Sequence, residues 1–396
     1  MRPLDGRHIW LVGIGGAGMS GYALLARSWG ATVGGWDRND TPYLGPVRAA
    51  GIEVRVSAEP EAPDGWELFV SSAYPGVGGR PRAELLAELV AAKPSIVVAG
   101  AHGKTTTAAM IAFALRETGR DPSWIVGGEV PQLGSNAGAG DGWLVVEGDE
   151  SDRSVASLRP RVAVVLNVDL DHHSEFGSRA ELEDLLDRWL AHVPEVVRGW
   201  ELEPLDVELA IPGEHNRRNA AAAAAALELV GMPRADAVAA LASFRGVGRR
   251  FELVGEARGV EIIDDYAHNP EKLRAALATA RERAGERGRV LALFQPHLYS
   301  RTLHLATELG RELAAADVAA VTEIYPAREQ PVPGVTGKLV VDALSDARPG
   351  LAPGWTPRLE DGARFLSRRA RAGDVVLTVG AGDVDRAARK ILEELS

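Results

Sequence analysis

Gly100 to Thr107 read GAHGKTTT, and this stretch lies between the apolar run Ser95–Ala99 and the helical sequence AAMIAFALRE. A strand that ends in a glycine turn and continues as a helix directs a row of backbone N–H groups at one point. The positive end of the helix dipole, the ammonium of Lys104 and the hydroxyl of Thr105 meet there, which suits a nucleoside triphosphate with Mg²⁺. The stretch therefore predicts an α/β unit that binds ATP.

The loop is shorter than the general phosphate-binding pattern, because Val98 stands where that pattern places a small residue six positions before the lysine. A chance Gly-Lys-Thr in a glycine-rich chain is the alternative, and the strand before the loop and the helix after it argue against this. The nucleotide-binding residues predicted in this loop are Gly100, His102, Gly103, Lys104, Thr105 and Thr106.

Composition limits the class of protein. The chain has 396 residues, of which 46% are hydrophobic and 25% charged, and this is typical of a soluble globular protein with two or three domains. A net charge of −11 without a long basic stretch argues against nucleic acid as a partner. The absence of cysteine excludes disulfides, thiolate metal sites and cysteine nucleophiles. No apolar stretch is long enough to span a membrane, so we expect a cytoplasmic protein; the oligomeric state is left open.

The N-terminal region predicts a parallel sheet flanked by helices. His8–Val12 is the first expected strand, and Gly13, Gly15 and Gly18 after it fit the pattern G-x-G-x-x-G, with Asp37 at the end of the next strand. The same glycine spacing can also serve close packing of a helix on a strand. A third strand is expected at Phe69–Ala73, which would place two hydroxyls at its carboxyl end.

Two further α/β units follow. The central unit is expected to hold strands at Trp143–Glu147 and Val162–Asn167, and a buried helix at Asn219–Val230 after a turn and N-cap in PGEHNRRN. The last unit alternates helical segments with four expected strands, at Val260–Ile263, Arg289–Phe294, Val318–Thr322 and Asp374–Val379. The predicted fold class is α/β with a Rossmann-like domain (1–92), a P-loop-type central domain with a shortened sheet (93–244) and a doubly wound C-terminal domain (245–396).

Polar residues follow three central strands where ligands gather in open α/β sheets. Besides the phosphate loop, Glu147 opens the acidic run EGDESD, and His172 lies in NVDLDHH. A carboxylate beside a phosphate loop typically holds Mg²⁺, so Thr105 and Glu147 are the strongest metal candidates; His172 is less natural because Mg²⁺ prefers oxygen. A solvated acidic turn and a loop-capping histidine are the alternatives, but three neighbouring strand ends together favour a site.

The last unit carries two polar loops of its own, DDYAHNP at 264–270 and FQPHLYSRT at 294–302. His297 and Arg301 in the second loop are suited to hold a small charged ligand. Arg249 or Arg250, at the entry to this unit, is placed to reach a triphosphate as a charge clamp. The alternative for Arg250 is a surface salt bridge between domains.

The order of these motifs resembles that in the Mur ligases over nearly the whole chain. The motifs GIGGAGMSG and FQPHLYSRT are the most discriminating. The resemblance implies three domains that bind in turn a UDP-sugar, ATP and an amino acid. The likeness is greatest to the members that join L-alanine to the lactyl carboxylate of UDP-N-acetylmuramate, through an acyl phosphate, in peptidoglycan precursor synthesis.

The resemblance also implies roles for individual residues. The expected UDP-substrate contacts are Gly15, Gly16, Ala17, Gly18, Met19, Ser20, Asp37, Ser71 and Ser72. For ATP and Mg²⁺, the implied phosphate and metal ligands are Lys104, Thr105, Glu147 and His172, and the implied nucleotide contacts are Asn216 and Asn219 (adenine), Asp265 (ribose) and Arg250 (γ-phosphate). The implied amino-acid pocket contains Tyr266, His268, His297 and Arg301. Lys104, Arg250 and His268 are the implied catalytic residues, with His268 as base or orienting group.

The chain departs from the family pattern in several places. It is short between Gly177 and His215, the stretch after SSAY is also clipped, Leu298 replaces a frequent arginine, and Asn269 replaces a frequent histidine. Reduced activity is therefore an alternative, as is a non-catalytic regulator that binds ATP or a UDP-sugar. A sister ligase for a peptide or for glutamate on a folate is a third reading, and a plain ATPase or motor is a fourth. The choice among alanine, serine and glycine, and any role of a monovalent ion, are left open.

Overall fold

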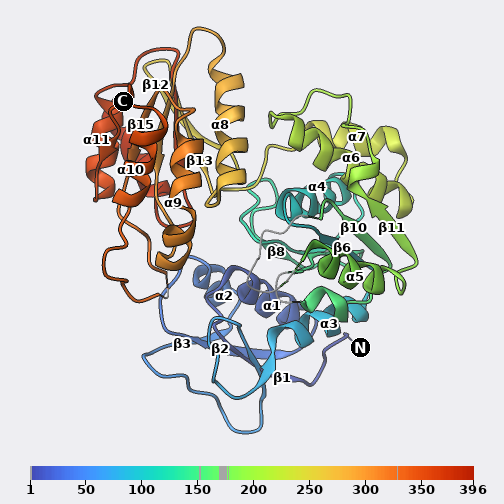
Figure 1. Cartoon of the computed structure of the whole chain (residues 1–396). Helices are drawn as coiled ribbons and strands as arrows, with labels where there is room; N and C mark the ends of the chain where they lie inside the picture. The colour runs from blue at the N-terminus through green and yellow to red at the C-terminus, as the bar shows by residue number, and fades with distance from the viewer. Residues whose placement is uncertain (1, 151–152, 169–175, 177, 328) are drawn as a thin grey trace. The chain divides into compact units, whose positions relative to one another are not determined.

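The computed structural model describes residues 2–150, 153–168, 176, 178–327 and 329–396. The chain divides into two compact units, residues 2–247 and residues 248–396. The first unit contains two β-sheets and the second contains one (Figure 1). Within the described residues no helix is both long enough and apolar enough to span a membrane.

The N-terminal sheet has five parallel strands in the order β3-β2-β1-β4-β5. The strands are β1 (His8–Val12), β2 (Thr32–Asp37), β3 (Glu53–Val56), β4 (Glu67–Val70) and β5 (Arg80–Pro81), and the helices are α1 (Ala17–Ser28), α2 (Leu44–Ala49) and α3 (Arg82–Ala92). Side chains of all three helices share one core with this sheet. Its other face is covered by an aromatic cluster around Trp10, Trp36, Trp66 and Tyr74. Strand β4 ends at Val70, so the expected strand at Phe69–Ala73 is shorter and its serines lie in the following turn.

The central sheet has six strands in the order β11-β10-β6-β9-β7-β8, and only β8 runs antiparallel to its neighbour. The strands are β6 (Ser95–Ala99), β7 (Ser123–Ile125), β8 (Ala137–Gly138), β9 (Leu144–Glu147), β10 (Val162–Val165) and β11 (Glu195–Arg198). The helices are α4 (Lys104–Glu117), α5 (Arg179–Leu190), α6 (Glu214–Leu229) and α7 (Arg234–Ala242), with 3₁₀ turns η1 (Ser154–Ser157) and η2 (Gly199–Glu201).

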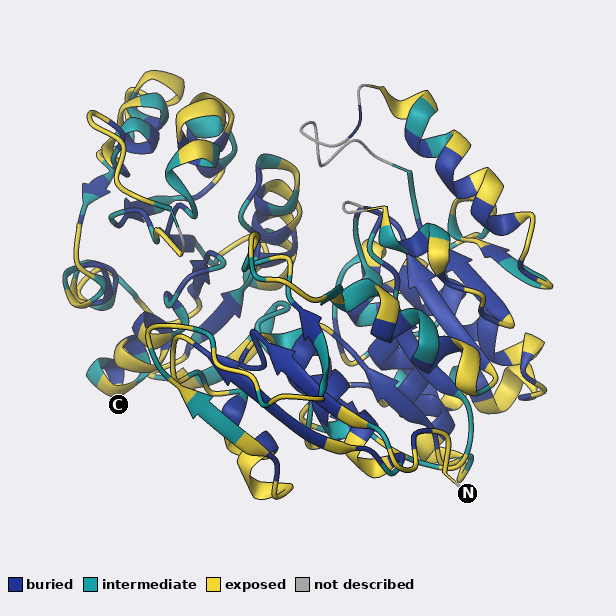
Figure 2. Ribbon diagram, turned by 90° about the horizontal axis from the view of Figure 1, so that it is seen from below, coloured by how far each residue is buried: buried dark blue, intermediate teal, exposed yellow. Residues whose placement is uncertain are grey.

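Successive side chains of β6 point to opposite faces of the sheet, and each face is covered by a hydrophobic core. Ile96 and Val98 pack in one core with α4, α6 and α7, whereas Val97 and Ala99 pack in the core that also holds the N-terminal helices. Figure 2 shows the strands as buried (dark blue) and the outer helix faces as exposed (yellow). The first unit therefore has its phosphate-loop strand at its centre.

The alanine-rich helix begins earlier than the sequence indicated. Helix α6 starts at Glu214 after Gly213, so most of PGEHNRRN forms its first turns rather than a preceding turn. This places Asn216 and Asn219 on the helix itself, where both side chains are buried.

The second unit is a sheet with helices on both faces, in the strand order β12-β13-β17-β14-β15-β16. The strands are β12 (Glu252–Ala257), β13 (Val260–Asp265), β14 (Val290–Phe294), β15 (Val318–Val321), β16 (Gly354–Trp355) and β17 (Val375–Val379). The helices are α8 (Pro270–Ala284), α9 (Tyr299–Leu313), α10 (Lys338–Ala347), α11 (Leu359–Ser367) and α12 (Asp385–Leu395). Only β12 is antiparallel to its neighbour.

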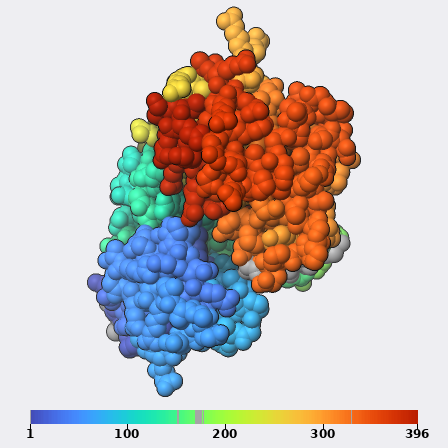
Figure 3. Space-filling model, turned by 90° about the vertical axis from the view of Figure 1, so that its left-hand side faces the viewer, coloured from blue at the N-terminus to red at the C-terminus, as the bar shows by residue number. Residues whose placement is uncertain are grey.

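Along β14 the side chains alternate between two cores. Val290, Ala292 and Phe294 pack with α8, α9 and α10, and Leu291 and Leu293 pack with α11 and α12. Figure 3 shows one face of this unit, coloured orange to red, as a closely packed surface. The doubly wound arrangement predicted for the C-terminal region is confirmed, and the carboxyl ends of β13, β14 and β17 lie together at one edge.

Candidate active site

The phosphate loop follows β6 and ends where α4 begins at Lys104, as the sequence predicted. Gly103 precedes the helix with φ +84°, a conformation that glycine adopts without strain. A β-carbon at Gly103 would lie 2.4 Å from Oδ1 of Asn219. Asn219 of α6 therefore lies directly against the loop, and Asn216 lies about one turn before it, with its Nδ2 donating to the carbonyl of Pro212 at 2.6 Å.

A second asparagine holds the loop from the neighbouring strand. The N–H of His102 donates to Oδ1 of Asn167 at 3.0 Å, and Nδ2 of Asn167 donates to the carbonyl of His102 at 3.1 Å. Gly100 approaches the same segment so closely that a β-carbon there would lie 3.1 Å from Asn167 backbone atoms. This reciprocal pair fixes the loop between β6 and β10, while Thr106 lies in the first turn of α4.

The ammonium of Lys104 has two partners in this structure. Its Nζ donates to the carbonyl of Gly100 at 2.7 Å and to the carboxylate oxygens of Glu150 at 2.8 and 3.0 Å. Glu150 is only 3% exposed, so a buried carboxylate holds the lysine at the loop. Sequence reasoning did not single out Glu150, because it is one of several acids in EGDESD.

Thr105 and Glu147 meet as predicted. Strand β9 pairs with β6 in parallel, with Glu147 opposite Val98, so Glu147 ends its strand beside the loop. The hydroxyl of Thr105 donates to Oε2 of Glu147 at 2.9 Å, and the N–H of Gly127 donates to Oε1 at 2.5 Å. His172, the third predicted metal ligand, lies outside the described residues.

These two oxygen side chains fit Mg²⁺, which typically takes one or two protein oxygens and completes its shell with phosphate and water. Among the described residues no group of three or more His, Asp or Glu side chains is placed to hold a metal.

The glycine loop of the N-terminal sheet is built around Asp37. Oδ2 of Asp37 accepts from the N–H of Gly15 at 2.8 Å, and Oδ1 accepts from the hydroxyl of Tyr74 at 3.0 Å. Asp37 is buried. Burial of the Tyr74 phenol, together with the negative charge of Asp37, raises the pKa of Tyr74. Gly13 has φ +88°, and a β-carbon there would lie 2.7 Å from Cβ of Ser71. Asp37, Gly15 and Ser71 are thus brought to one place, with Tyr74 as a residue that the sequence reasoning missed.

The remaining predicted residues of the N-terminal site differ in position and exposure. Gly16 precedes α1, and Gly18 lies in its first turn. The carbonyl of Ala17 accepts from Nδ2 of Asn136 at 2.8 Å and from the hydroxyl of Ser20 at 3.0 Å. Met19 is 2% exposed and packs in the core, so its side chain is occupied there. Ser72 is exposed in the turn after β4.

In the second unit the two consecutive arginines have different surroundings. The guanidinium of Arg249 pairs with the buried carboxylate of Asp264, with Nε and Oδ2 2.9 Å apart. The guanidinium of Arg250 lies over the ring of Tyr266, 5.0 Å from its centroid. Asp265 accepts from the N–H groups of Phe251 and Ala267, both at 2.8 Å. Arg250 is thus the arginine of the two that faces a ring rather than a buried acid.

The four predicted amino-acid residues form one cluster. The rings of Tyr266 and His268 are 5.6 Å apart, and those of His268 and His297 are 6.2 Å apart. Arg301 approaches His297, with its Nη1 3.2 Å from Nδ1. Because a guanidinium only donates, this contact makes Nδ1 of His297 the acceptor. Tyr325, which stacks on His297 at 5.8 Å, is a member that no motif indicated.

His268 is a half-buried, neutral imidazole. Its Nδ1 is 2.9 Å from the carbonyl of Tyr266, and since a carbonyl only accepts, Nδ1 carries the proton and Nε2 the lone pair. Desolvation in the folded protein, followed by the charges of Lys272 and Arg301, lowers the pKa of His268 to about 3. A group this weakly basic is suited to accept a hydrogen bond and to orient an amine.

The lowered pKa of His268 predicts a pH dependence of stability. A histidine in the unfolded chain has a pKa near 6.5. Below that pH, His268 therefore binds a proton in the unfolded chain but stays unprotonated in the native protein. Between pH 7 and pH 5 this residue should therefore lower the free energy of unfolding by about 2 kcal/mol. Chemical denaturation of wild type and His268→Gln at both pH values measures the difference, and equal losses in the two proteins would contradict it.

Two departures from the family pattern lie directly before helices. Oδ1 of Asn269 accepts from the N–H of Lys272 at 2.9 Å, so the asparagine caps the N-terminus of α8. Leu298 precedes α9 with φ +69°, a strained conformation for a branched residue. Glu329, also missed by the sequence reasoning, accepts from the N–H and hydroxyl of Ser300 in the first turn of α9.

Three family models match the chain. They are described as the Mur ligase family catalytic domain over residues 8–94, the Mur ligase middle domain over 98–195 and the Mur ligase glutamate ligase domain over 249–382. Together they match more than half of the chain.

Curated relatives and solved structures agree with these matches. The UDP-N-acetylmuramate–L-alanine ligase of Streptomyces coelicolor is 38% identical, with 97% of each chain covered, and that of Rubrobacter xylanophilus is 37% identical, with 98% and 100% covered. The crystal structure of the UDP-N-acetylmuramate-alanine ligase from Thermotoga maritima matches with a TM-score of 0.82 at 27% identity, covering 98% of each chain. A murein peptide ligase from Psychrobacter arcticus, at 23% identity and a TM-score of 0.66, shows the same fold. The two curated alignments run over 450 and 445 positions against 396 residues, so the relatives contain segments that this chain lacks.

Proposed function

The chain belongs to the Mur ligase family, and on that premise we propose that it joins L-alanine to the lactyl carboxylate of UDP-N-acetylmuramate at the expense of ATP. The observation that carries the proposal is the meeting of Lys104, Thr105 and Glu147 at the ends of two paired parallel strands. The names of the curated relatives supply the substrates. The reaction is a step in making the peptidoglycan precursor, and we place it in the cytoplasm, where ATP is made.

We propose that three domains divide the substrates: residues 1–92 take the UDP-sugar, 93–244 take ATP and 245–396 take the amino acid. The glycine loop with Asp37, Ser71 and Ser72 is the UDP-sugar site in this proposal. Its loop N–H groups lie at the N-terminus of α1, which favours the negative charge of a pyrophosphate. The second unit offers the imidazole and guanidinium groups around His297 and Arg301 for a zwitterionic amino acid.

In the proposed ATP site, Lys104 leaves Glu150 and binds the phosphates together with the N–H groups of the loop. Thr105 and Glu147 hold Mg²⁺, which when bound neutralises charge on the phosphates. Asn216 and Asn219 contact the adenine, Asp265 contacts the ribose and Arg250 reaches the γ-phosphate. The predicted role of His172 as a further metal ligand stays part of this proposal.

The proposed reaction has two steps. An oxygen of the lactyl carboxylate attacks the γ-phosphorus, the bond to the β,γ-bridging oxygen breaks, and ADP leaves with an acyl phosphate in place. The amine of L-alanine then attacks the acyl carbon, and inorganic phosphate leaves with the former carboxylate oxygen. Phosphorylation is needed because a carboxylate has no good leaving group. Lys104 and Arg250 stabilise the charge on the transferring phosphoryl group.

In the second step the amine must lose a proton before it attacks. Nε2 of His268 carries a lone pair, because Nδ1 donates to the carbonyl of Tyr266. The low pKa of this imidazole makes it a poor store for the amine proton, so we assign His268 the orientation of the amine and leave the proton to phosphate or water.

ADP release tests the proposal directly. We expect sustained ADP release, beyond one equivalent per protein chain, only when ATP, UDP-N-acetylmuramate and L-alanine are all present, because the acyl phosphate turns over only when an amine arrives. A panel of alanine, serine, glycine, glutamate and a short peptide should give its highest rate with alanine. Strong stimulation by glutamate or a peptide in place of alanine would identify a sister ligase, and ATP binding without turnover would identify a regulator.

A further inference from the structure

The segment at the start of the second unit, residues 248–251, contains two consecutive arginines, and their side chains make different contacts. Arg249 has φ +60° and Phe251 has φ +51°, so both neighbours of Arg250 have a conformation that non-glycine residues rarely adopt. Such a backbone persists only where surrounding contacts hold it. Those contacts come from the side chain of Arg249 and from hydrogen bonds of the backbone at Arg249 and Phe251.

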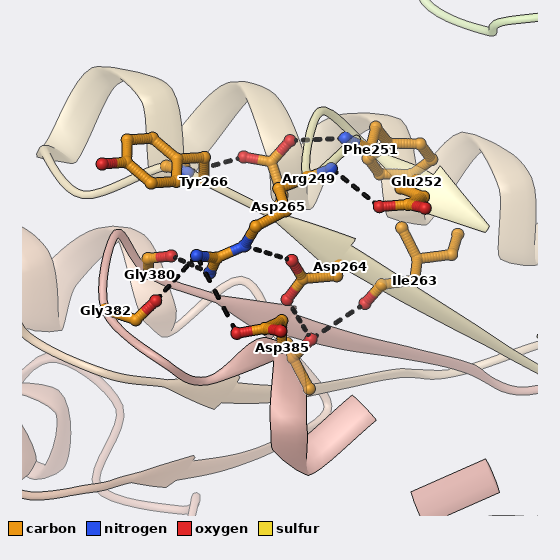
Figure 4. Close-up of polar contacts among 12 residues, drawn as sticks. Arg249, Phe251, Glu252, Ile263, Asp264, Asp265, Tyr266, Gly380, Gly382 and Asp385 are labelled. Carbon is orange, nitrogen blue, oxygen red and sulfur yellow. Dashed lines mark hydrogen bonds and ion pairs between the residues drawn. The ribbon is translucent and has the colours of Figure 1, made fainter. Parts of the chain in front are cut away.

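The guanidinium of Arg249 is fully engaged at the carboxyl ends of β13 and β17 (Figure 4). Its Nε donates to Oδ2 of Asp264 at 2.9 Å, and its two terminal nitrogens donate to the carbonyls of Gly380 and Gly382, both at 2.7 Å. Asp264 is 1% exposed, and its other oxygen accepts from the hydroxyl of Thr378 at 2.6 Å. The fork of one side chain thus ties the entering segment to two strand ends.

Backbone hydrogen bonds also hold the residues on either side of Arg250. The carbonyl of Arg249 accepts from the N–H of Tyr266 at 2.8 Å, and the N–H of Phe251 donates to Asp265 at 2.8 Å. The guanidinium of Arg250 then lies over the ring of Tyr266, and that of Arg249 lies 5.2 Å from the same ring centroid. Arg250 therefore extends from a backbone that is held on both sides.

Stability alone does not account for this pair. Burying an arginine and a carboxylate together costs desolvation that their attraction repays only with good geometry, and well-packed apolar residues typically do as well. Burial raises the pKa of Asp264 to about 6 even beside Arg249, which shows how strongly its charge is desolvated. The contact between half-buried Arg249 and buried Asp264 also fixes one geometry for residues 249–251, which is a role that such pairs have in other proteins.

We propose that Arg249 is a positioning residue: through Asp264, Gly380 and Gly382 it fixes the backbone from which Arg250 reaches the γ-phosphate. The inference rests on the proposed function and adds a residue to it. In this proposal Arg249 does not bind the triphosphate itself, and its effect on phosphoryl transfer is transmitted through Arg250.

A double-mutant cycle tests this dependence, because Arg249 can matter to catalysis only while Arg250 is present. Arg250→Ala should lower turnover about 10²–10³-fold. Arg249→Lys, which keeps the charge but loses the fork, should lower turnover by roughly tenfold or more in the wild-type background. In the Arg250→Ala background the same Arg249→Lys change should have less than about a twofold effect. Asp264→Asn, which keeps the shape of the anchor, should follow the same pattern with a smaller loss.

A matched control is available at the opposite edge of the same sheet, where β14 and β17 begin. Arg289 makes a two-point contact with buried Asp374, at 2.6 and 3.2 Å, and donates to the carbonyl of Arg369 at 2.8 Å, just before β14 and β17. Arg289→Lys should leave turnover within about twofold of wild type. Melting temperatures of all variants identify any that fail to fold, and for such a case the Asp264→Asn cycle gives the answer.

The same double-mutant cycle can be measured as affinity for ATP, by calorimetry in the absence of the other substrates. This readout does not depend on turnover. Multiplicative losses for Arg249→Lys and Arg250→Ala, in turnover or in affinity, would overturn the inference, because Arg249 would then act by itself. A wild-type protein that binds ATP yet shows no alanine-dependent turnover would overturn the proposed function while the affinity cycle still decides the role of Arg249. Absence of ATP binding by the wild type would overturn both.

Discussion

Lys104→Ala should lower turnover by about 10³-fold or more, because no other described cation in the first unit lies at the start of α4 to meet the transferring phosphoryl group. The lysine is held at the loop by Gly100 and Glu150 and has only to exchange the carboxylate for phosphate oxygens. The measurement is the rate of ADP release with all three substrates at saturation.

Removing Lys104 alone also leaves the buried carboxylate of Glu150 without its charge partner, and this typically destabilises a protein by about 3–5 kcal/mol. The double variant Lys104→Ala/Glu150→Gln removes both charges and should recover stability without recovering turnover. Lys93→Ala is the control, since Lys93 donates to the carbonyl of Gly140 at the other end of β6. Substantial turnover in a folded Lys104→Ala protein would contradict the proposed phosphate site.

Glu147→Gln should lower turnover by about 10²-fold at a fixed Mg²⁺ concentration and should shift the Mg²⁺ dependence to higher concentration. The amide keeps the size of the side chain. Its oxygen can still accept from the N–H of Gly127, and its NH2 can donate to the hydroxyl of Thr105, so the loop should keep its shape. What is lost is the negative charge that attracts the cation. A titration of turnover against Mg²⁺ separates this effect from a loss of folding.

The control for the metal prediction is Glu129→Gln, because Glu129 is an exposed acid two residues after Gly127. Its Mg²⁺ dependence should match that of wild type. If Glu147→Gln instead had the wild-type Mg²⁺ dependence with a reduced rate, Glu147 would serve the loop and not the metal.

The phosphate site could be predicted from the sequence because it depends on local pattern and on one rule of topology. An apolar run, a glycine turn and Lys104 predict a helix start, and parallel strands bring their carboxyl ends to one edge, which placed Glu147 beside Thr105. The clustering of His268 with His297 follows from the same rule in the second unit.

Other features could not be predicted, because they depend on conformation that the pattern does not encode. Nothing in EGDESD distinguishes Glu150, which pairs with the lysine, from its acidic neighbours. Arg249 and Arg250 are identical side chains, and nothing in the pattern indicates which of them pairs with buried Asp264. Tyr325 reaches His297 from a loop without any motif. The start of α6 was misplaced because PGEHNRRN has the composition of a turn, although most of it is helical.

Isotope transfer tests the central claim most directly. UDP-N-acetylmuramate labelled with ¹⁸O in its lactyl carboxylate should be incubated with ATP, Mg²⁺, L-alanine and the protein, and the products analysed by mass spectrometry. The account predicts an amide product and inorganic phosphate that carries one labelled oxygen, because the carboxylate oxygen that attacks phosphorus leaves with it. Unlabelled phosphate, or ADP formation without an amide product, would contradict it.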